Sequence, residues 1–385
     1  MKNREAFLAL VRAGLCGNTN DNDLPALQAC DLSGANQNEN LFEGLDRGEV
    51  LKLAEEQSVL GLLSAGVEKL PNGILPLTEK LTLLGKCQLI DQCNVAMNRF
   101  LADLARQMSE AGINAVLLKG QGIAQCYERP LWRSSGDVDL LFDKEDYEKA
   151  KKILLPLALE TGKEFEYNQH QSLTIGSFTV ELHGSQRCGL SSRMDAVIDE
   201  VPREVCEKGK TRTWMNGDVP INLPAPDEDI ILVFTHFLKH FYKGGLGLRQ
   251  ICDWCLLLWT YWETIDVSLL ESRLREMRLL SEWKAFAAFA VGMLGMPVEA
   301  MPLYDTSSRW KRKAKKIEEF VMKSGNLGYN RETNLSGRSY VSKKAHSMGR
   351  RLSDSFHHAR IFPLDSLRFM PTIMFQGLMS AARGE

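Results

Sequence analysis

The sequence has no long hydrophobic run, little net charge and no cysteine-rich region. Its longest apolar stretch, residues 285–298, contains two glycines and a proline and is too short to span a bilayer. A formal net charge of -2 on 385 residues gives no overall attraction to nucleic acid or to an anionic membrane. The nine cysteines are scattered and odd in number, which favours reduced thiols over disulfides. We therefore expect a soluble, cytoplasmic protein with no transmembrane segment and no strong tendency to bind nucleic acid.

The hydrophobic pattern divides the chain into four segments. Apolar residues recur at helical spacing up to about residue 106, with a polar loop at 32–40. Short apolar runs of strand length follow, and the helical pattern returns after Pro224-Ala225-Pro226. The predicted units are an N-terminal helical unit (1–109), an α/β core (110–225), a C-terminal helical unit (226–325) and an extension of unclear fold (326–385).

Within 110–225 the pattern predicts strands, two hairpins and two helices. Gly176-Ser177 and Asn216-Gly217 are typical of tight hairpin turns, and Asp143 is a good N-cap for the second helix. The predicted strands are 115–118, 138–142, 172–175, 178–183, 211–215 and 219–223, and the predicted helices are 120–127 and 144–155. The fold class is therefore α+β, with a mixed sheet between two helical units.

Carboxylates recur at alternate positions in two of these strands. Asp137 and Asp139 would share one face of the first strand, while Val138 and Leu140 face the core. Two such anions repel each other, and a hard divalent cation bound through oxygen would relieve that repulsion. Glu181 supplies a third carboxylate from a later strand. Three acidic ligands can hold two Mg²⁺ (or Mn²⁺) ions, which is the arrangement used for phosphoryl and nucleotidyl transfer.

A glycine-containing turn precedes the paired acids. The run VLLKGQG is a strand that enters a helix through glycine, where backbone N–H groups can approach phosphate oxygens. Lys119 adds a positive charge, so Lys119, Gly120 and Gln121 are predicted to bind the triphosphate of a nucleotide. Arg133, in the loop before the acids, is a second candidate for phosphate binding.

Taken together, LLKG, WRSSGDVDLLF, VELH, FTHFLKHF and GLRQICDW resemble a bacterial nucleotidyltransferase-like family of unassigned substrate in the DNA polymerase beta superfamily. The resemblance runs from about residue 50 to 330. It implies a polymerase-beta-type sheet, metal ligation by Asp137, Asp139 and Glu181, and a phosphate-binding turn at Gly120. The sequence departs from the superfamily at two positions, since Gln121 stands where serine is usual and Glu181 where aspartate is usual.

Three histidines and one aspartate are weaker candidates for contacts in the cleft. His236 and His240 are four residues apart on a helix, but no glutamate follows His236, so the zinc-protease motif is absent. His183 lies on the strand of Glu181. A histidine in such a position is more often a hydrogen-bonded partner than a metal ligand, so we expect a hydrogen bond. Asp253 is a candidate general base, and its spacing from Arg249 also fits an ion pair.

Two further patterns have ordinary structural interpretations. Cys252 and Cys255 form C-x-x-C without the βαβ context of a redox motif, so we expect core packing. The basic run at 309–316 predicts a solvated helix face. Basic residues at 343–351 and the apolar segment 362–379 are compatible with a surface that binds a membrane or a partner protein, and this alternative stays open.

The sequence thus predicts an enzyme that transfers a nucleoside monophosphate from a nucleoside triphosphate such as ATP to an acceptor, with release of pyrophosphate. The resemblance suggests a small molecule or saccharide as the acceptor. Two alternatives stay open: a catalytically inactive nucleotide-binding protein on the same fold, and an interaction protein that uses the C-terminal segments. The acceptor, the base preference and the oligomeric state are not predicted.

Overall fold

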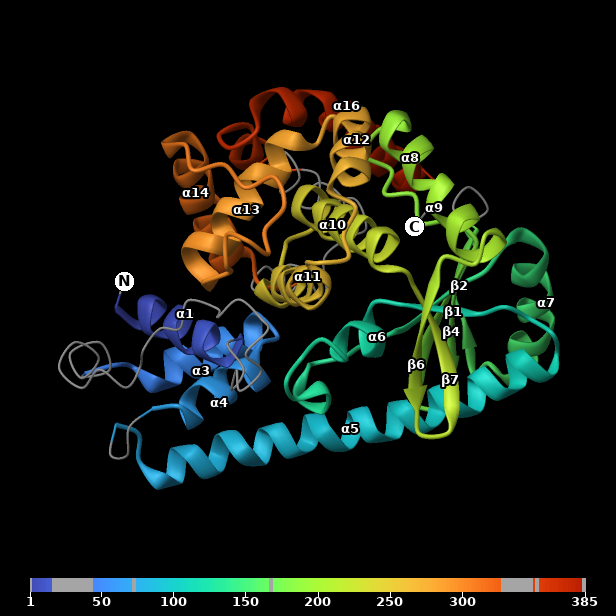
Figure 1. The fold of residues 1–385 in the computed structure, drawn as a ribbon, viewed down its shortest axis with the longest axis horizontal. Coiled ribbons are helices and arrows are strands. Elements are labelled where there is room, and N and C mark those ends of the chain that lie inside the picture. The colour runs from blue at the N-terminus through green and yellow to red at the C-terminus, as the bar shows by residue number, and fades with distance from the viewer. Residues whose placement is uncertain are drawn as a thin grey trace.

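The computed structural model describes residues 2–15, 44–70, 74–165, 169–326, 349 and 353–382, and shows the predicted α+β fold (Figure 1). Helices at both ends of the chain flank a seven-stranded mixed sheet, which confirms the predicted fold class. The polar loop expected at 32–40 and the basic residues at 343, 344, 350 and 351 lie outside the described residues.

The N-terminal part is helical, as predicted, and is formed by α1 (Lys2–Leu15), α3 (Arg47–Glu56), α4 (Leu60–Glu68) and α5 (Leu77–Glu110). Helices α1 and α4 cross closely because each has a glycine at the contact. A Cβ on Gly14 would lie 1.9 Å from the Leu62 carbonyl oxygen, and one on Gly66 would lie 2.0 Å from that of Leu10. Helix α5 has 34 residues and runs from these helices along the whole sheet (Figure 1).

The sheet has the order β3-β4-β5-β2-β1-β7-β6. Strands β4 and β5 pair through a two-residue turn at Gly176-Ser177, as predicted. Strands β6 and β7 also form the predicted hairpin, but Asn216 is the last strand residue and the turn is Gly217-Asp218. The strands are β1 (Val116–Leu118), β2 (Val138–Leu141), β3 (Glu160–Thr161), β4 (His170–Ile175), β5 (Phe178–His183), β6 (Thr211–Asn216) and β7 (Val219–Pro224).

Short elements connect the strands. They are α6 (Gly120–Ala124), η1 (Pro130–Trp132), α7 (Lys144–Leu154), η2 (Leu155–Leu157), α8 (Ser192–Ile198), α9 (Glu200–Pro202) and η3 (Arg203–Glu207). Asp143 caps α7 by accepting a hydrogen bond from the Asp146 N–H, as predicted. The predicted helix at 120–127 is shorter than expected, because α6 ends at Ala124.

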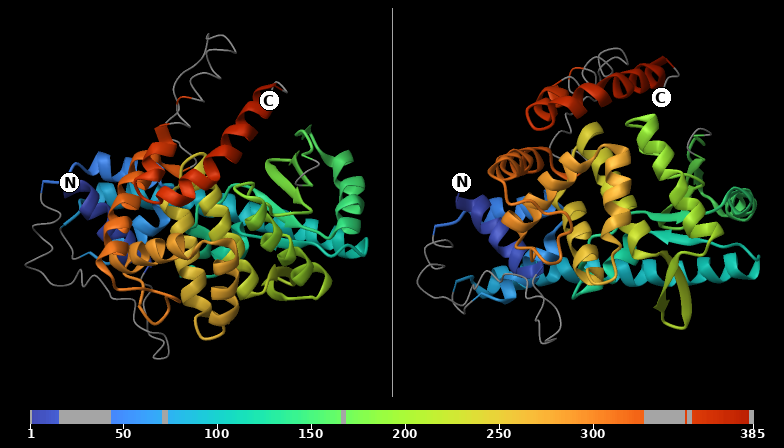
Figure 2. Two further views of the ribbon diagram at one scale, coloured as in Figure 1. Left: turned by 90° about the horizontal axis from the view of Figure 1, so that it is seen from above. Right: turned by 45° about the horizontal axis from the view of Figure 1, so that its top comes forward.

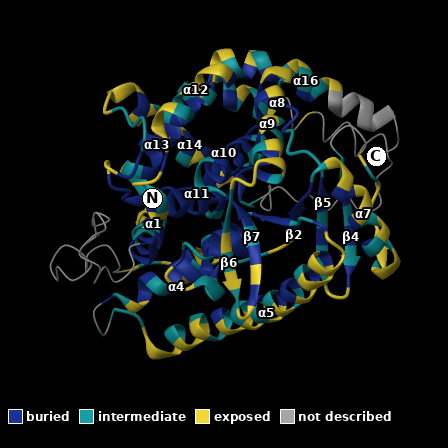
Figure 3. Cartoon of the chain, turned by 45° about the vertical axis from the view of Figure 1, so that its right-hand side comes forward, coloured by how far each residue is buried: buried dark blue, intermediate teal, exposed yellow. Residues whose placement is uncertain are grey.

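The two faces of the sheet are covered by different helices. Side chains such as Leu140 and Leu182 pack with α5 and α7 on one face, in a buried apolar cluster that also contains Met108 and Tyr147. Because strand residues alternate, Asp139 and Glu181 point to the other face. That face meets α10 and α11, which are largely buried (Figure 3).

The C-terminal helices are α10 (Pro226–Lys243), α11 (Leu248–Tyr261), α12 (Val267–Met277), α13 (Leu280–Leu294), α14 (Ser308–Ser324) and α16 (Pro363–Ala382). Cys252 and Cys255 are fully buried in α11, as expected for core packing. In α14 the basic run exposes Lys311, Arg312 and Lys315, while Trp310 is buried, which confirms the predicted solvated face.

The apolar segment 362–379, whose fold the sequence left open, lies in helix α16 on the outside of the C-terminal helices (Figure 2). Phe362 and Phe369 are buried against them, whereas Leu364 and Leu367 are exposed. Within the described residues, no helix combines the length and the apolar character needed to cross a membrane.

A buried ion pair joins the sheet to the C-terminal helices. Arg133, in the loop after η1, donates from Nε to Asp253 Oδ1 at 2.7 Å and from Nη2 to Asp253 Oδ2 at 2.8 Å. The hydroxyl of Tyr127 also donates to Asp253, at 2.7 Å. Both charged side chains are almost completely buried, so each depends on the other for compensation of its charge.

A second buried acid lies among the C-terminal helices. Glu282 of α13 is completely buried and accepts a hydrogen bond from the Tyr242 hydroxyl at 3.0 Å. Burial and the neighbouring Asp365 carboxylate raise the pKa of Glu282 to about 8. The native state therefore keeps the Glu282 proton at pH values at which the unfolded chain has lost it.

Removal of Arg133 should be costly. We expect Arg133→Met to lower the free energy of unfolding, measured by urea denaturation, by about 3–5 kcal/mol, because Asp253 is left buried and unpaired. Arg129→Met is the matched control on the other side of η1. Its ion pair with Glu68 is exposed, so its loss should cost less than about 1 kcal/mol. Equal losses of stability in the two variants would contradict a special role for the buried Arg133–Asp253 ion pair.

Replacement of Glu282 should change the pH dependence of stability. Between the ordinary glutamate pKa of 4.5 and about 8, unfolding of the native protein releases the Glu282 proton, so stability falls as pH rises. The slope from this group is at most about 1.4 kcal/mol per pH unit. Glu282→Gln has no such proton. The thermal midpoint of the variant minus that of the native protein should therefore increase from pH 5 to pH 8. Glu276→Gln, on the exposed surface of α12, controls for the charge change; a constant difference for Glu282→Gln would contradict the assignment.

Candidate active site

The three acids predicted to act together line one cavity. Strands β2 and β5 pair in parallel, and the register sets Asp139 directly beside Glu181. Asp137 lies just before β2, exposed at the mouth of the same cavity. The sheet thus brings Asp137 and Asp139 together with Glu181, which lies more than forty residues later in the sequence.

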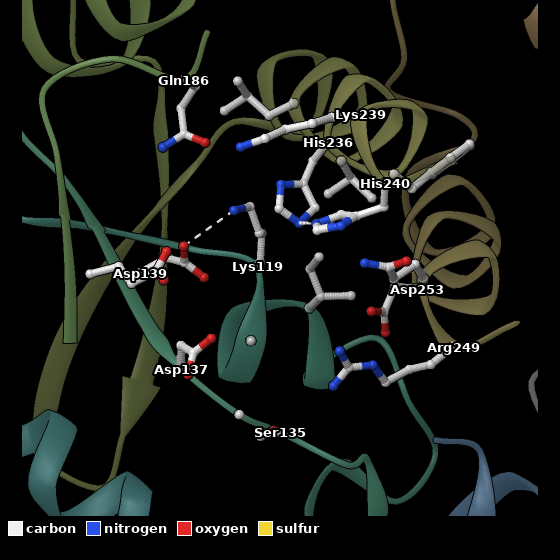
Figure 4. A pocket seen from close by; sticks show the side chains of 18 of the residues that line it. Lys119, Ser135, Asp137, Asp139, Gln186, His236, Lys239, His240, Arg249 and Asp253 are labelled. Atoms are coloured by element: carbon white, nitrogen blue, oxygen red, sulfur yellow. Dashed lines mark hydrogen bonds and ion pairs between the residues drawn. The ribbon is translucent and has the colours of Figure 1, made fainter. Parts of the chain in front are cut away.

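The cavity has a volume of about 610 Å³ and lies between the sheet and helices α10 and α11. Its sheet side carries the acids, Lys119 and Gly120. Its helical side carries His236, Lys239 and His240 from α10 and Arg249 and Asp253 from α11 (Figure 4). One wall therefore carries three carboxylates, and the opposite wall carries the cations Lys239 and Arg249.

Asp139 is held by two cationic or hydrogen-bonding groups. Its Oδ1 lies 3.2 Å from Lys119 Nζ and 2.8 Å from His183 Nε2. Burial alone would raise the pKa of Asp139, but Lys119 and His183 outweigh burial and hold it below the ordinary value. His183 is thus a hydrogen-bonded partner of the acids, as the sequence suggested.

Glu181 contacts two histidines. Its Oε2 lies 3.2 Å from His170 Nε2 and 3.4 Å from His183 Nε2, and these contacts strongly lower the pKa of Glu181. His170 was not among the predicted site residues, because the strand was expected to begin at residue 172. Strand β4 begins at His170, which pairs with His183 across the hairpin. Residues 170–172 are all polar, so no hydrophobic alternation in the sequence marked this longer strand.

Asp137 differs from the other two acids. Its pKa is raised by partial burial of the carboxylate and by repulsion from Glu181 and Asp139. Within the described part of the chain, no cation pairs with it at salt-bridge distance. Three convergent carboxylates with an excess of negative charge are a donor set that fits a hard divalent cation.

The predicted phosphate-binding turn has an unusual backbone. Lys119 has φ of 53° and Gly120 has φ of 39°, so the chain enters α6 through two consecutive residues in the left-handed region. Glycine adopts this conformation without strain, whereas lysine does not. Such strain is retained where the surroundings impose it, and here the Lys119 ammonium group lies 3.2 Å from Asp139 Oδ1.

Gln121 does not present its side chain to the cavity. It is buried and donates to Asn94 Oδ1 at 2.8 Å and to the Met97 sulfur at 3.3 Å, both on α5. The side chain therefore fixes α6 to α5. Only the backbone of Gln121 is available for the predicted contact with a triphosphate.

Arg133 and Asp253 reach the cavity wall, but their charged groups are already engaged with each other. Although burial would raise the pKa of Asp253, Arg133 outweighs burial and holds it below the ordinary value, so Asp253 is a weak base. The expected ion pair of Asp253 with Arg249 is wrong. Arg249 donates instead to the backbone carbonyl of Ser134, because the closer Arg133 occupies both carboxylate oxygens.

His236 and His240 form a hydrogen-bonded pair with 3.0 Å between their Nε2 atoms. Burial and nearby lysines lower the pKa of both, that of His240 to about 3. The pair is therefore neutral at physiological pH and offers hydrogen-bonding and ring surfaces without charge. Both histidines line the cavity, as predicted for cleft contacts.

Lys239 and Arg249 were not predicted as ligand contacts. Lys239 extends into the cavity, and among the described residues no carboxylate lies at ion-pair distance from it (Figure 4). Burial lowers the pKa of Lys239 and that of Arg249, so both are desolvated cations. Desolvated, unpaired cations facing an acidic wall are typical of a site that receives an anionic ligand between them.

One family of known proteins matches the chain over most of its length. Residues 43–295 match the model of a family described as an uncharacterised nucleotidyltransferase. The solved structure of an antigenic nucleotidyltransferase-like protein from Paracoccidioides brasiliensis is similar at 14% identity and a TM-score of 0.30, covering 48% of this chain and 90% of that chain. Among curated proteins, none matches the chain. The family match spans more than half of the chain and includes all three acids, so the chain belongs to this uncharacterised nucleotidyltransferase family.

Proposed function

We propose that the protein transfers a nucleoside monophosphate from a nucleoside triphosphate to the hydroxyl or phosphate of an acceptor. The acceptor oxygen bonds to the α-phosphorus, the bond from that phosphorus to its bridging oxygen breaks, and pyrophosphate leaves. One observation carries the proposal: three carboxylates and two desolvated cations face each other across one cavity. An anionic phosphate chain with its metal ions fits between walls of these opposite signs.

The acids would hold the metal. Asp137, Asp139 and Glu181 present oxygen donors from neighbouring strands, which fits Mg²⁺ or Mn²⁺. A bound divalent ion activates the attacking oxygen and neutralises charge that develops on the phosphates. The protein's own part is to hold the carboxylates in register and to keep Lys119 beside them.

The opposite wall would bind the phosphate chain. Lys239 and Arg249 point into the cavity and can approach phosphate oxygens, with Lys119 and the Gly120 backbone on the sheet side. The neutral His236–His240 pair lies beside Lys239 and could contact the base or the acceptor. A cavity of about 610 Å³ is the size of a small-molecule site, which supports a small molecule or saccharide as the acceptor.

A second function, nucleotide binding without transfer, is favoured by two observations. Lys119 and His183 both contact Asp139 Oδ1, which a metal ion would need to share. The side chain of Gln121, which replaces the usual serine, is also turned away from the cavity. A protein that kept these contacts after nucleotide binding would bind without catalysis.

Substitution of the paired acids separates these functions. We expect acceptor-dependent pyrophosphate release from one or more of the four nucleoside triphosphates, with Mg²⁺ or Mn²⁺. Asp137→Ala/Asp139→Ala should reduce it at least about a hundredfold, because the charge that stabilises the transition state is lost. Glu160→Gln, an exposed acid on the edge strand β3, should leave it unchanged. Release that survives the double substitution would refute the proposal, while nucleotide-dependent thermal stabilisation without release would favour the second function.

Lys239 provides a test of phosphate binding. Lys239→Met should raise the KM for the nucleoside triphosphate roughly tenfold or more, since a hydrogen bond to a charged group contributes about 1.5–3 kcal/mol. The thermal midpoint should stay the same or rise, because a desolvated and unpaired charge is removed. Lys311→Met on the exposed face of α14 is the control. An unchanged KM, or a loss of stability, would show that Lys239 has a structural role instead.

A further inference from the structure

Two histidines and a glutamate converge at the edge of the acidic wall. One ligand atom from each of His170, Glu181 and His183 lies within 4.8 Å of the other two. The hairpin register explains the convergence, because His170 pairs with His183 across β4 and β5, and Glu181 is two residues before His183 on the same face. Three potential metal ligands of mixed nitrogen and oxygen type therefore meet at one point.

The orientation of His170 is fixed by its neighbours. Its ring lies between those of Phe165 and His183, with centroid distances of 6.0 and 4.8 Å. The His170 side chain is 24% exposed and lines the cavity, so an ion could reach it from solvent. Asp139 Oδ1, which is 2.8 Å from His183 Nε2, adds an oxygen next to the same cluster.

We propose that His170, Glu181 and His183 bind a divalent transition-metal ion of the Fe²⁺ to Zn²⁺ class. This inference rests on the proposed function, because it assigns one ion of that same site. Mg²⁺ prefers six oxygen ligands, whereas imidazole nitrogen is a preferred ligand of Zn²⁺ and related ions. Two imidazoles and one carboxylate leave further coordination positions for Asp139, water or a phosphate oxygen, as in an open catalytic site.

Zinc binding tests the proposal. We expect the native protein to bind one Zn²⁺ that a large excess of Mg²⁺ does not displace, measured by competition with a chromophoric chelator. His170→Gln should weaken Zn²⁺ binding at least about tenfold, because even a change in an indirect partner of a metal ligand costs about 10–100-fold. His183→Gln should do the same. His240→Gln is the matched control, since His240 lies in the same cavity but bonds to His236.

X-ray absorption of the zinc-loaded protein gives a readout that does not depend on activity. Imidazole scattering should be present in the native protein and reduced in His170→Gln, whose unchanged thermal midpoint would show that it is folded. Absence of zinc binding, binding without imidazole scattering, or a loss with His240→Gln but not with His170→Gln would overturn the proposal. Zinc bound through imidazole without nucleotidyl transfer would refute only the proposed function. Transfer supported by oxygen-bound metal would refute only this inference.

Discussion

The parallel pairing of β2 with β5 is the constraint on which the site depends. It sets Asp139 beside Glu181, and the alternation of strand residues then sends both carboxylates to the face opposite α5 and α7. A shift of β2 by one residue would turn Asp139 into the apolar cluster and Leu140 into the cavity. The packing of the sheet against α5 and α7 therefore also fixes the geometry of the acidic wall.

Charge balance explains the groups that surround the acids. Asp139 and Glu181 are stabilised as anions by Lys119, His170 and His183, while Asp137 is left without a cationic partner among the described residues. On the helical side Lys239 and Arg249 are left without anionic partners in the same part of the chain. Each wall thus contains charged groups for which the described residues provide no partner of opposite charge, which lowers the stability of the protein. This is usual where a bound ligand supplies the opposite charges.

Much of the fold and part of the site followed from local patterns. Six of the seven strands, both hairpins and the α7 cap were predictable because strand alternation, turn residues and N-caps act over a few residues, whereas the two-residue strand β3 was not predicted. The meeting of Asp137, Asp139 and Glu181 was predictable once the acids were assigned to neighbouring strands beside the turn that is predicted to bind phosphate. The division into units at residues 109, 225 and 325 stays a prediction.

Contacts between distant segments could not be predicted. Arg133 and Asp253 are 120 residues apart, and no local pattern indicates that they pair. The direction of Lys239 into the cavity depends on how α10 packs on the sheet. Gln121 turns toward α5 because Asn94 lies there, 27 residues earlier in the chain. His170 was missed for a smaller reason, since its strand was predicted to begin two residues too late, at residue 172.

The most direct test of the account is a crystal structure with a divalent metal and an α,β-methylene nucleoside triphosphate, in which the bond expected to break cannot be cleaved. We expect the metal at Asp137, Asp139 and Glu181, with the phosphates between these acids and Lys239 and Arg249. A nucleotide bound elsewhere, or one in this cavity with its phosphates turned away from the acids, would contradict it.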